Sequence, residues 1–454
     1  MVENKIGRTV IYNARLALDA TIVPGYLVID GEFIAEVGEG DVPEALLDEN
    51  NTLIDADGRL VMPGVIDEHV HFRDPGLTHK ADMISESRAA VAGGVTSFID
   101  MPNTVPATTT VAAVEDKMAH AGEVSSANFS FFIGATNSNI EELLNADYTR
   151  IAGVKLFLGS STGNMLVDSE STVSRIFAEV PALIAVHAED EAIISANRKK
   201  VIEKYGEDAP VELHPLIRSR EACVEATRKA VEGARKYNAR LHVLHISTEE
   251  ELSFFSPGPI ESKRITAETC PQYLIFTNEQ YSGYGSGIKC NPAIKMPEDR
   301  VALRSAVADG VIDVVATDHA PHLPEEKIGG ALKAVSGMPM IQFSLPVMLT
   351  LAAEGAFTTE KVIEVMCHNP AKLYGIDRRG FLRPGYYADV VLVDDQCEPY
   401  TVTSDMVLSK CGWTPLEGAP LGAKVDITWV NGEVVWRYGV LFSGKRGKAL
   451  RFKR

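Results

Sequence analysis

Two histidines in this sequence are spaced so that they could share one metal ion. His69 and His71 are separated by one residue near the end of a predicted strand, residues 64–72. In a β-strand, side chains at positions i and i+2 point to the same face, so both imidazoles can converge on one ion. Imidazole nitrogen is a common ligand of zinc. The spacing therefore predicts a metal site at the end of this strand.

Further polar residues stand at the ends of other predicted strands. His187, His245 and Asp318 each lie at the C-terminal end of an apolar run. Parallel barrel strands are normally apolar throughout, and barrel active sites lie at the C-terminal ends of the strands. A single histidine in such a place is more often a core residue. Five metal-binding side chains at four strand ends, with His69 and His71 included, indicate a site.

His242 offers an alternative to His245. The two histidines are three residues apart in one predicted strand, so their side chains point to opposite faces. We select His245 because it is nearer the C-terminal end of the strand, where the site is expected. Four histidines without such a placement are predicted to be structural: His79, His120, His214 and His368.

Lys155 is an unusual residue for the inside of a predicted strand, residues 153–158. A free ammonium group there would repel a metal ion and would be costly to remove from water. Two explanations stay open from the residues alone. Either the side chain points outward or forms a salt bridge, or its neutral amine adds carbon dioxide to form a carbamate, whose two oxygens can bridge two cations.

The middle of the chain supplies the elements that must position these residues. Eight β-like segments alternate with longer helical patterns, of which residues 81–92, 111–121 and 221–236 are the clearest. Eight such units in roughly 300 residues predict an α/β fold, the (β/α)8 TIM barrel. The predicted strands are residues 64–72, 97–101, 128–134, 153–158, 183–187, 241–246, 264–268 and 312–318.

Both ends of the chain differ from the middle. Short β-branched or aromatic runs are separated by turns, and the pairs Asp30-Gly31 and Asn431-Gly432 are hairpin signals. We predict that residues 1–61 and 378–454 fold together as a small β-sandwich domain, and that residues 62–377 form the barrel. The predicted terminal strands are residues 9–12, 26–30, 33–37, 389–393, 425–430 and 434–436.

Composition and charge exclude several classes of protein. The chain has 454 residues, of which 45% are hydrophobic and 23% charged, with a formal net charge of −18. So acidic a chain is not expected to bind nucleic acid or an anionic membrane, because both need a basic face. No apolar run approaches the roughly 18 residues of a membrane helix, and no secretory signal is visible, so a cytoplasmic protein is expected. The six cysteines include no C-x-x-C pair and are predicted to be buried free thiols.

The motifs around these residues resemble a known family. The runs Met62-Pro-Gly-Val-Ile-Asp-Glu-His-Val-His-Phe-Arg-Asp-Pro-Gly76 and Thr317-Asp-His-Ala-Pro-His322 are similar to those of the amidohydrolase superfamily, and of the dihydroorotase family within it. Further similar segments are Met101-Pro-Asn-Thr104, Gly153-Val-Lys-Leu-Phe-Leu158, Val186-His-Ala-Glu189, Leu244-His-Ile-Ser247 and Asn291-Pro292. The resemblance extends from about residue 62 to residue 374 and implies a barrel with an accompanying β-sandwich.

The resemblance implies a centre of two zinc ions. The implied ligands are His69, His71 and Asp318 for the first Zn²⁺, His187 and His245 for the second, and carboxylated Lys155 as a bridge between them. Asp318 would also carry the proton of the reaction. With neutral imidazoles, such a centre keeps a small positive charge and favours an anionic substrate.

The resemblance also implies residues that bind the substrate. Arg73, Asn103 and His322 would hold a substrate carboxylate, to which a planar guanidinium is well suited. Asn291 would contact the ring of a pyrimidine-like substrate. The family often continues with Pro-Leu-Arg, whereas this chain has Ala-Ile-Lys, so the similarity is weaker in that loop. Residues 323–339 are expected to form a mobile loop over the substrate.

The implied reaction is the reversible interconversion of N-carbamoyl-L-aspartate and L-dihydroorotate in pyrimidine biosynthesis. Three alternatives stay open: an allantoinase or dihydropyrimidinase, a catalytically inactive relative that serves as a scaffold, and a barrel amidohydrolase for another substrate. The first group generally lacks the arginine and the histidine found here at Arg73 and His322, and inactive relatives usually lose metal ligands. The expected partner is a small-molecule substrate and neither nucleic acid nor membrane, and a homo-oligomer stays open.

Overall fold

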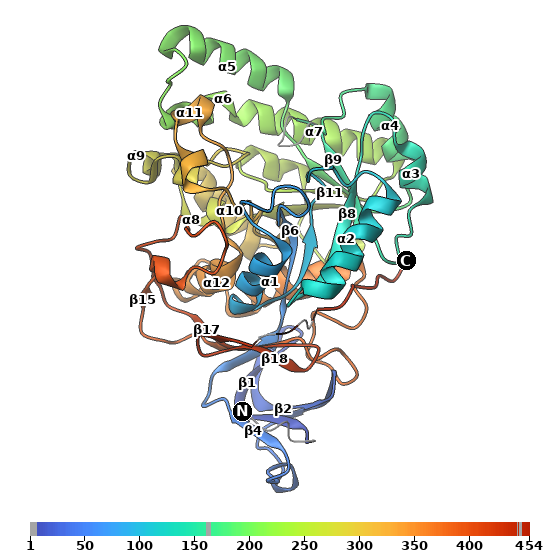
Figure 1. Cartoon of the computed structure of the whole chain (residues 1–454), viewed down its shortest axis with the longest axis vertical. Helices are drawn as coiled ribbons and strands as arrows, with labels where there is room; N and C mark the ends of the chain where they lie inside the picture. Colours follow the sequence, from blue (N-terminus) through green and yellow to red (C-terminus); the bar gives the residue numbers. More distant parts are fainter. Residues whose placement is uncertain (1–6, 160–164, 443, 445–446) are drawn as a thin grey trace.

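A parallel β-barrel forms the larger part of the molecule (Figure 1). The computed structural model describes residues 7–159, 165–442, 444 and 447–454. Eight strands follow one another around the barrel in chain order. Their bounds are β6 (Val65–Val70), β7 (Val95–Asp100), β8 (Asn128–Gly134), β9 (Gly153–Phe157), β10 (Ile184–His187), β11 (Leu241–Val243), β12 (Ile265–Thr269) and β13 (Val314–Val315). The predicted (β/α)8 fold is confirmed.

The barrel closes where the segment after β13 meets the end of β6. Val70 forms a parallel bridge with His319, and the amide of His71 donates to the carbonyl of His319 over 2.8 Å. Asp67 supports this barrel seam, because its carboxylate accepts hydrogen bonds from the amide and the hydroxyl of Thr317 at 3.1 and 2.6 Å. The seam therefore brings the residues after β13 next to His71.

Several strands end earlier than the sequence predicts, β6 by two residues and β11 and β13 by three each. β11 ends at Val243 and β13 at Val315, so His245 and Asp318 lie in the loops that follow. Both residues have a positive φ, 44° and 47°, which an extended strand does not contain. The backbone therefore turns at each of these residues as it leaves the barrel wall.

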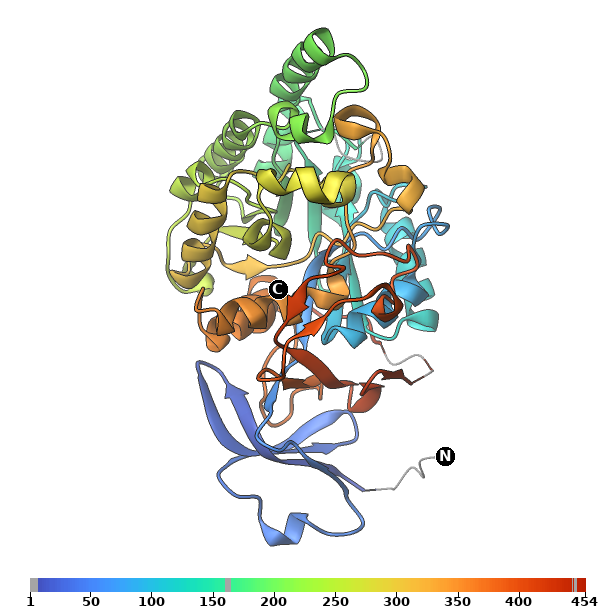
Figure 2. The same ribbon diagram turned by 90° about the vertical axis from the view of Figure 1, so that its left-hand side faces the viewer.

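Helices cover the outside of the barrel (Figures 1 and 2). The longest, α7, buries a stripe of small residues that includes Ala222, Ala226 and Ala230, and it ends at Asn238 in the left-handed conformation. The helices are α1 (Met83–Ala92), α2 (Val111–Val124), α3 (Ile140–Asn145), α4 (Glu170–Glu179), α5 (Glu191–Tyr205), α6 (His214–Ile217), α7 (Arg220–Tyr237), α8 (Pro271–Ile275), α9 (Tyr281–Tyr284), α10 (Pro297–Ala308), α11 (Gly330–Lys333), α12 (Ser344–Ala353), α13 (Thr359–Ile363) and α14 (Asn369–Tyr374). Within the described ranges, no helix has the length and apolar character needed to cross a membrane.

The two ends of the chain fold together, as predicted, in one sheet of nine strands. Its strands are β1 (Thr9–Leu18), β2 (Thr21–Asp30), β3 (Phe33–Glu39), β4 (Thr52–Asp55), β5 (Leu60–Pro63), β14 (Val390–Asp394), β17 (Lys424–Val430), β18 (Glu433–Arg437) and β19 (Val440–Leu441). A second pair consists of β15 (Tyr400–Thr401) and β16 (Pro420–Leu421). Figures 1 and 2 show the C-terminal strands between the barrel and the N-terminal strands. The division of the chain near residues 61 and 378 stays a prediction.

The last residues of the chain return to the barrel. Ala449 forms a parallel bridge with Phe129 of β8, and the side chain of Arg454 donates to the carbonyls of Tyr148, Ile151 and Ala152. The chain end therefore packs at the start of β8 and β9, at the opposite end of these strands from the C-terminal mouth of the barrel.

Candidate active site

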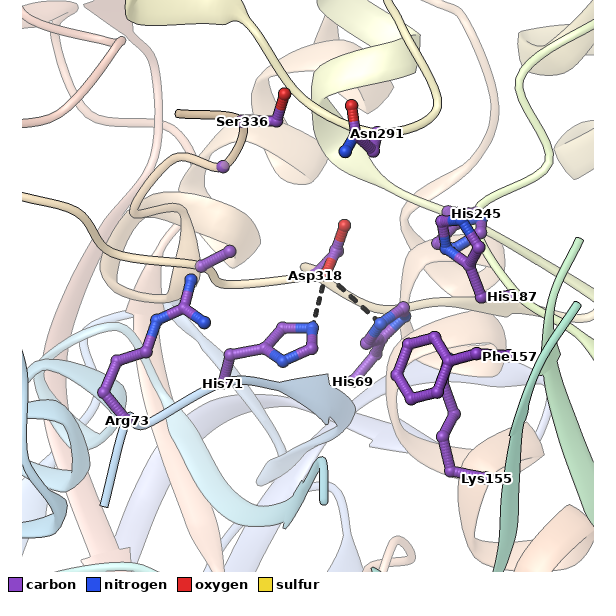
Figure 3. A pocket seen from close by; sticks show the side chains of 12 residues that line it. His69, His71, Arg73, Lys155, Phe157, His187, His245, Asn291, Asp318 and Ser336 are labelled. Atoms are coloured by element: carbon purple, nitrogen blue, oxygen red, sulfur yellow. Dashed lines mark hydrogen bonds and ion pairs between the residues drawn. The ribbon is translucent and has the colours of Figure 1, made fainter. Parts of the chain in front are cut away.

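A pocket at the C-terminal end of the barrel strands gathers most of the predicted chemical residues (Figure 3). It is lined by His69, His71, Arg73, Lys155, Phe157, His187, His245, Asn291, Asp318, Ala320, Ser336 and Gly337. All six residues predicted to be metal ligands are in this set. The fold therefore brings together side chains from widely separated parts of the chain.

Asp318 lies against the two histidines of the first predicted strand. Its Oδ1 atom is 3.2 Å from Nε2 of His69 and 3.0 Å from Nε2 of His71, and the three side chains point at one another in Figure 3. Two imidazole nitrogens and a carboxylate oxygen within this distance form a donor set that suits zinc. These residues fit the first metal position implied by the sequence.

Each of these histidines is held by a partner on its other ring nitrogen. Nδ1 of His69 lies 2.9 Å from Oε1 of Glu268, and Nδ1 of His71 lies 2.7 Å from Oδ1 of Asn103. Because these oxygens are acceptors, each Nδ1 donates, and each Nε2 is turned toward Asp318. Asn103 thus contacts a predicted metal ligand and does not itself line the pocket.

His187 and His245 form a second group. Nδ1 of His187 lies 2.8 Å from Nε2 of His245. Nε2 of His187 lies 3.0 Å from Oε2 of Glu189, and Glu189 forms an ion pair with Arg218. The amide of His245 donates to Oε1 of Glu268 over 2.9 Å. Glu268 therefore contacts both groups of histidines.

Lys155 points into the pocket and not outward. Its side chain is 1% exposed, and its Nζ atom lies 4.8 Å from the centre of the Phe157 ring. Among the described residues, no carboxylate lies within ion-pair distance of it. Burial lowers the pKa of Lys155 to about 8, so a neutral amine, the form that can add carbon dioxide, is accessible near neutral pH. The carbamate itself stays a prediction.

Neighbouring carboxylates make the first group attractive to a cation. Burial alone would lower the pKa of His69, but Glu268 and Asp318 outweigh it and raise this pKa to about 10. Burial would likewise raise the pKa of Asp318, but His69 and His71 outweigh it and hold this pKa well below its usual range. The negative charges that favour a proton on His69 would also attract a metal cation.

Arg73 lines the pocket, and His322 lies beside it but is not among the lining residues. Nη2 of Arg73 is 3.0 Å from Nε2 of His322, and Nζ of Lys80 is 3.1 Å from Nδ1 of the same ring. Burial and these cations hold the pKa of His322 well below its usual range. Arg73 is 3% exposed and donates through Nε to the carbonyl of Pro321. Within the described part of the chain, no carboxylate is close enough to pair with its guanidinium.

Asn291 and two residues of the segment 323–339 also line the pocket. The Asn291 side chain lies across the pocket from the histidines in Figure 3, and its Oδ1 atom is buried without a hydrogen-bond partner among the described residues. The segment 323–339 contributes Ser336 and Gly337 to the lining. Lys327 links this segment to the neighbouring loop by donating to the carbonyl of Lys289 over 3.0 Å. The predicted mobility of the segment stays a prediction.

Sequence reasoning missed several residues of the site. Glu268 stands at the C-terminal end of a predicted strand, the signal used for the histidines, and could have been found in that way. Phe157 lies two residues after Lys155 on β9 and therefore shares its face. Ser336 and Gly337 reach the pocket only through the path of a loop. No short-range pattern marks those last two residues.

Of the two histidines considered for the sixth predicted barrel strand, His245 lines the pocket and His242 does not. His242 is fully buried inside the barrel, where its ring bonds to Glu68 at 2.8 Å and to Thr266 at 2.7 Å. The histidines predicted to be structural also lie outside the pocket lining: His214 and His368 bond to backbone carbonyls, His120 to Asp74, and His79 is exposed.

Comparison with known proteins gives matches along most of the chain. Residues 60–435 match the Amidohydrolase family. The chain is 36% identical over 428 residues to a dihydroorotase of Halobacterium salinarum, covering 93% of this chain and 96% of that protein. It is 32% identical over 397 residues to an allantoinase of Streptomyces avermitilis, covering 86% and 87%. Among solved structures, an L-hydantoinase (dihydropyrimidinase) from Arthrobacter aurescens is similar with a TM-score of 0.90 at 28% identity, covering 98% of this chain and 99% of that one.

Proposed function

Because this chain belongs to the amidohydrolase family and is a cyclic amidohydrolase, we propose that it is a dihydroorotase. Such an enzyme interconverts N-carbamoyl-L-aspartate and L-dihydroorotate on the route to UMP. The sequence relatives that bear this name support the proposal. Relatives with other names are nearly as similar, so the argument for the substrate must come from the pocket.

The observation that carries the proposal is the guanidinium of Arg73. It is buried at the edge of the pocket, and no carboxylate of the described residues pairs with it. A buried cation without an anion is costly, whereas a substrate carboxylate could form two parallel hydrogen bonds with it. Dihydroorotate carries a carboxylate on its ring, and hydantoin and allantoin carry none. Lys80, which contacts His322, is already ion-paired with Glu326 at 2.5 Å, so the argument rests on Arg73 alone.

The donor sets of the pocket support a centre of two zinc ions. The residues that would hold them are His69, His71 and Asp318 for one ion, His187 and His245 for the other, and Lys155 as a carbamate between the two. When bound, the ions would polarise the reacting amide carbonyl and lower the pKa of the attacking water. The Nδ1 contacts of His69 and His71 would keep both Nε2 atoms directed at this centre.

The chain's own residues would orient the substrate and move the proton. Arg73 would hold the substrate carboxylate, so that the ring amide faces the histidines. Asp318 would take a proton from the attacking water and give it to the leaving ring nitrogen during ring opening, and ring closure would reverse these steps. Asn291, whose Oδ1 atom is free to accept, would bond to an N–H of the ring. Phe157 and Ser336 would limit the access of further water.

A second candidate is a hydrolase of cyclic ureides, such as a hydantoinase or allantoinase. The likeness to an L-hydantoinase structure over 98% of the chain favours it. A substrate of this kind would leave Arg73 without an anionic partner. A catalytically inactive scaffold has less support, because all of the proposed metal ligands are present in the pocket lining.

Turnover of four compounds by the zinc-loaded protein tests the proposal. We expect kcat/KM for L-dihydroorotate to exceed the values for hydantoin and allantoin by roughly a hundredfold or more, and N-carbamoyl-L-aspartate to be cyclised in the reverse direction. Arg73→Gln should remove most of this preference. Faster turnover of hydantoin or allantoin would favour the second candidate, and a zinc-loaded protein inactive on all four would favour either the scaffold or an amidohydrolase for another substrate.

A further inference from the structure

A layer of buried polar groups lies behind the barrel seam that carries Asp318. His319 follows Asp318 directly and is fully buried. Its carbonyl accepts a hydrogen bond from the amide of His71 over 2.8 Å, and its own amide donates to the hydroxyl of Thr317 over 3.0 Å. The backbone of His319 therefore determines where two of the proposed metal ligands lie.

The ring of His319 is held in one orientation and one tautomer. The amides of Met340 and Ile341 lie 3.1 and 3.3 Å from its Nδ1 atom. A backbone amide can only donate, so Nδ1 is the acceptor and Nε2 carries the hydrogen. Nε2 lies 2.8 Å from Oε2 of Glu86, which receives that hydrogen. Glu86 therefore determines how the ring of His319 is seated.

Glu86 is a fully buried carboxylate on α1 that accepts four hydrogen bonds. Besides the ring of His319, the donors are the hydroxyl of Ser409 at 2.7 Å, the amide of Lys410 at 3.0 Å and the hydroxyl of Ser85 at 2.8 Å. Ser409 and Lys410 are more than 320 positions from Glu86 in the chain. This one side chain thus joins the barrel seam to a distant C-terminal segment.

The same C-terminal segment, residues 409–414, contacts the loop after Asp318 at a second point. The indole Nε1 of Trp413 donates to the carbonyl of His322 over 2.7 Å. Lys410 also bonds to Asp82, which caps the start of α1. Helix α1, the barrel seam and the C-terminal segment are therefore connected by these hydrogen bonds.

We infer that Glu86 is a positioning residue for Asp318 and His71. It holds the ring of His319, whose backbone fixes both ligands, and it ties this turn to residues 409–414. The inference rests on the proposed metal-binding roles of Asp318 and His71. Glu86 is not among the residues that line the pocket, so it acts through His319 and not on the substrate.

The substitution Glu86→Gln tests this inference in the full chain. An amide has only one acceptor oxygen, and its NH2 group would face donors, so at least one of the four hydrogen bonds is lost. Asp389→Asn is the matched control. Asp389 is also a buried carboxylate with several donors, among them the amide of Asn431 at 2.8 Å and Asn128 at 3.1 Å, and it lies outside the pocket lining.

Four quantities are measured for each variant: the melting temperature, the zinc retained during dialysis against a graded chelator, kcat and KM. We expect both variants to melt earlier. Only Glu86→Gln should lose zinc at a roughly tenfold lower chelator concentration and lose kcat by roughly tenfold, with KM changed less than threefold. A Glu86→Gln protein with a lowered melting temperature but normal zinc retention and kcat would overturn the inference.

A shorter carboxylate keeps the test decisive if Glu86→Gln does not fold. Glu86→Asp keeps the charge but is one methylene shorter, which withdraws the oxygen that accepts from both His319 and Ser409. Zinc retention and kcat should therefore both fall, and unchanged values would overturn the inference. Zinc retention does not depend on which cyclic amide is the substrate. Failure of the dihydroorotase assignment would therefore appear in the wild-type assays, while failure of the positioning role would appear in the zinc measurement.

Discussion

Oδ1 of Asp318 lies 3.0 Å from Nε2 of His71, although 247 positions separate the two residues in the chain. The contact exists because the loop after β13 folds onto the end of β6, where the amide of His71 bonds to the carbonyl of His319. The first proposed metal position is therefore built on the seam at which the barrel closes. Changes at this seam should affect that position before they affect His187 and His245.

Arg73→Lys should raise KM for L-dihydroorotate by roughly tenfold or more, with a smaller change in kcat. Lysine keeps the charge but offers a single point instead of the planar fork that matches a carboxylate. Steady-state kinetics with the zinc content measured in parallel would check this. As a control, any turnover of hydantoin should be unchanged, because hydantoin has no carboxylate. An unaltered KM would remove the main argument for an anionic substrate.

Asp318→Asn should keep much of the zinc and lose kcat by roughly a hundredfold or more. The amide oxygen can still approach a metal ion, but an amide cannot take up and return a proton near neutral pH. Zinc analysis of the same preparation separates lost proton transfer from lost metal. If kcat stayed near the wild-type value, another group would have to carry the proton.

Much of the site could be predicted because it follows strand periodicity. His69 lies in β6, His71 directly follows the last residue of that strand, and His187 ends β10, so a count along each strand is enough to place them. His245 and Asp318 were found for the same reason, although both lie just past their strands with positive φ. Predicting site residues from the C-terminal ends of barrel strands therefore works even where the predicted strand is slightly too long.

Residues that reach the site through loops or through other side chains could not be predicted. Glu86 belongs to an ordinary amphipathic helix, and its role depends on Ser409 and His319, which are near it only in the folded chain. The return of residues 447–454 to β8 is likewise a tertiary contact without a local pattern. The barrel strands could be predicted because each is a short apolar run, whereas buried hydrogen-bond networks leave no such run in the sequence.

Cys397 should be the cysteine that reacts with a thiol reagent in the native protein. All six cysteines are free, five of them are buried, and Cys397 is half-buried. Burial raises its thiol pKa, so the reaction should be slow at neutral pH and faster at higher pH, where more thiolate is present. A spectrophotometric thiol titration should find about one reactive group before unfolding and six after it. Cys397→Ser should abolish the native reaction, and rapid release of several thiols would contradict the buried positions.

Lys155→Ala should lose zinc and most activity, and short carboxylic acids should restore part of both. A lysine amine offers one lone pair at most, whereas a carbamate offers two oxygens and a negative charge that can bridge two ions. Lys155 lines the pocket with His187 and His245, so we expect the metal beside these histidines to be lost first. Zinc content and kcat with and without added acetate or propionate give the measurement. Lys117→Ala is the control, since that buried lysine pairs with Asp100 outside the pocket lining and acetate should not rescue it. If Lys155→Ala bound two zinc ions and turned over normally, the bridging assignment would be wrong.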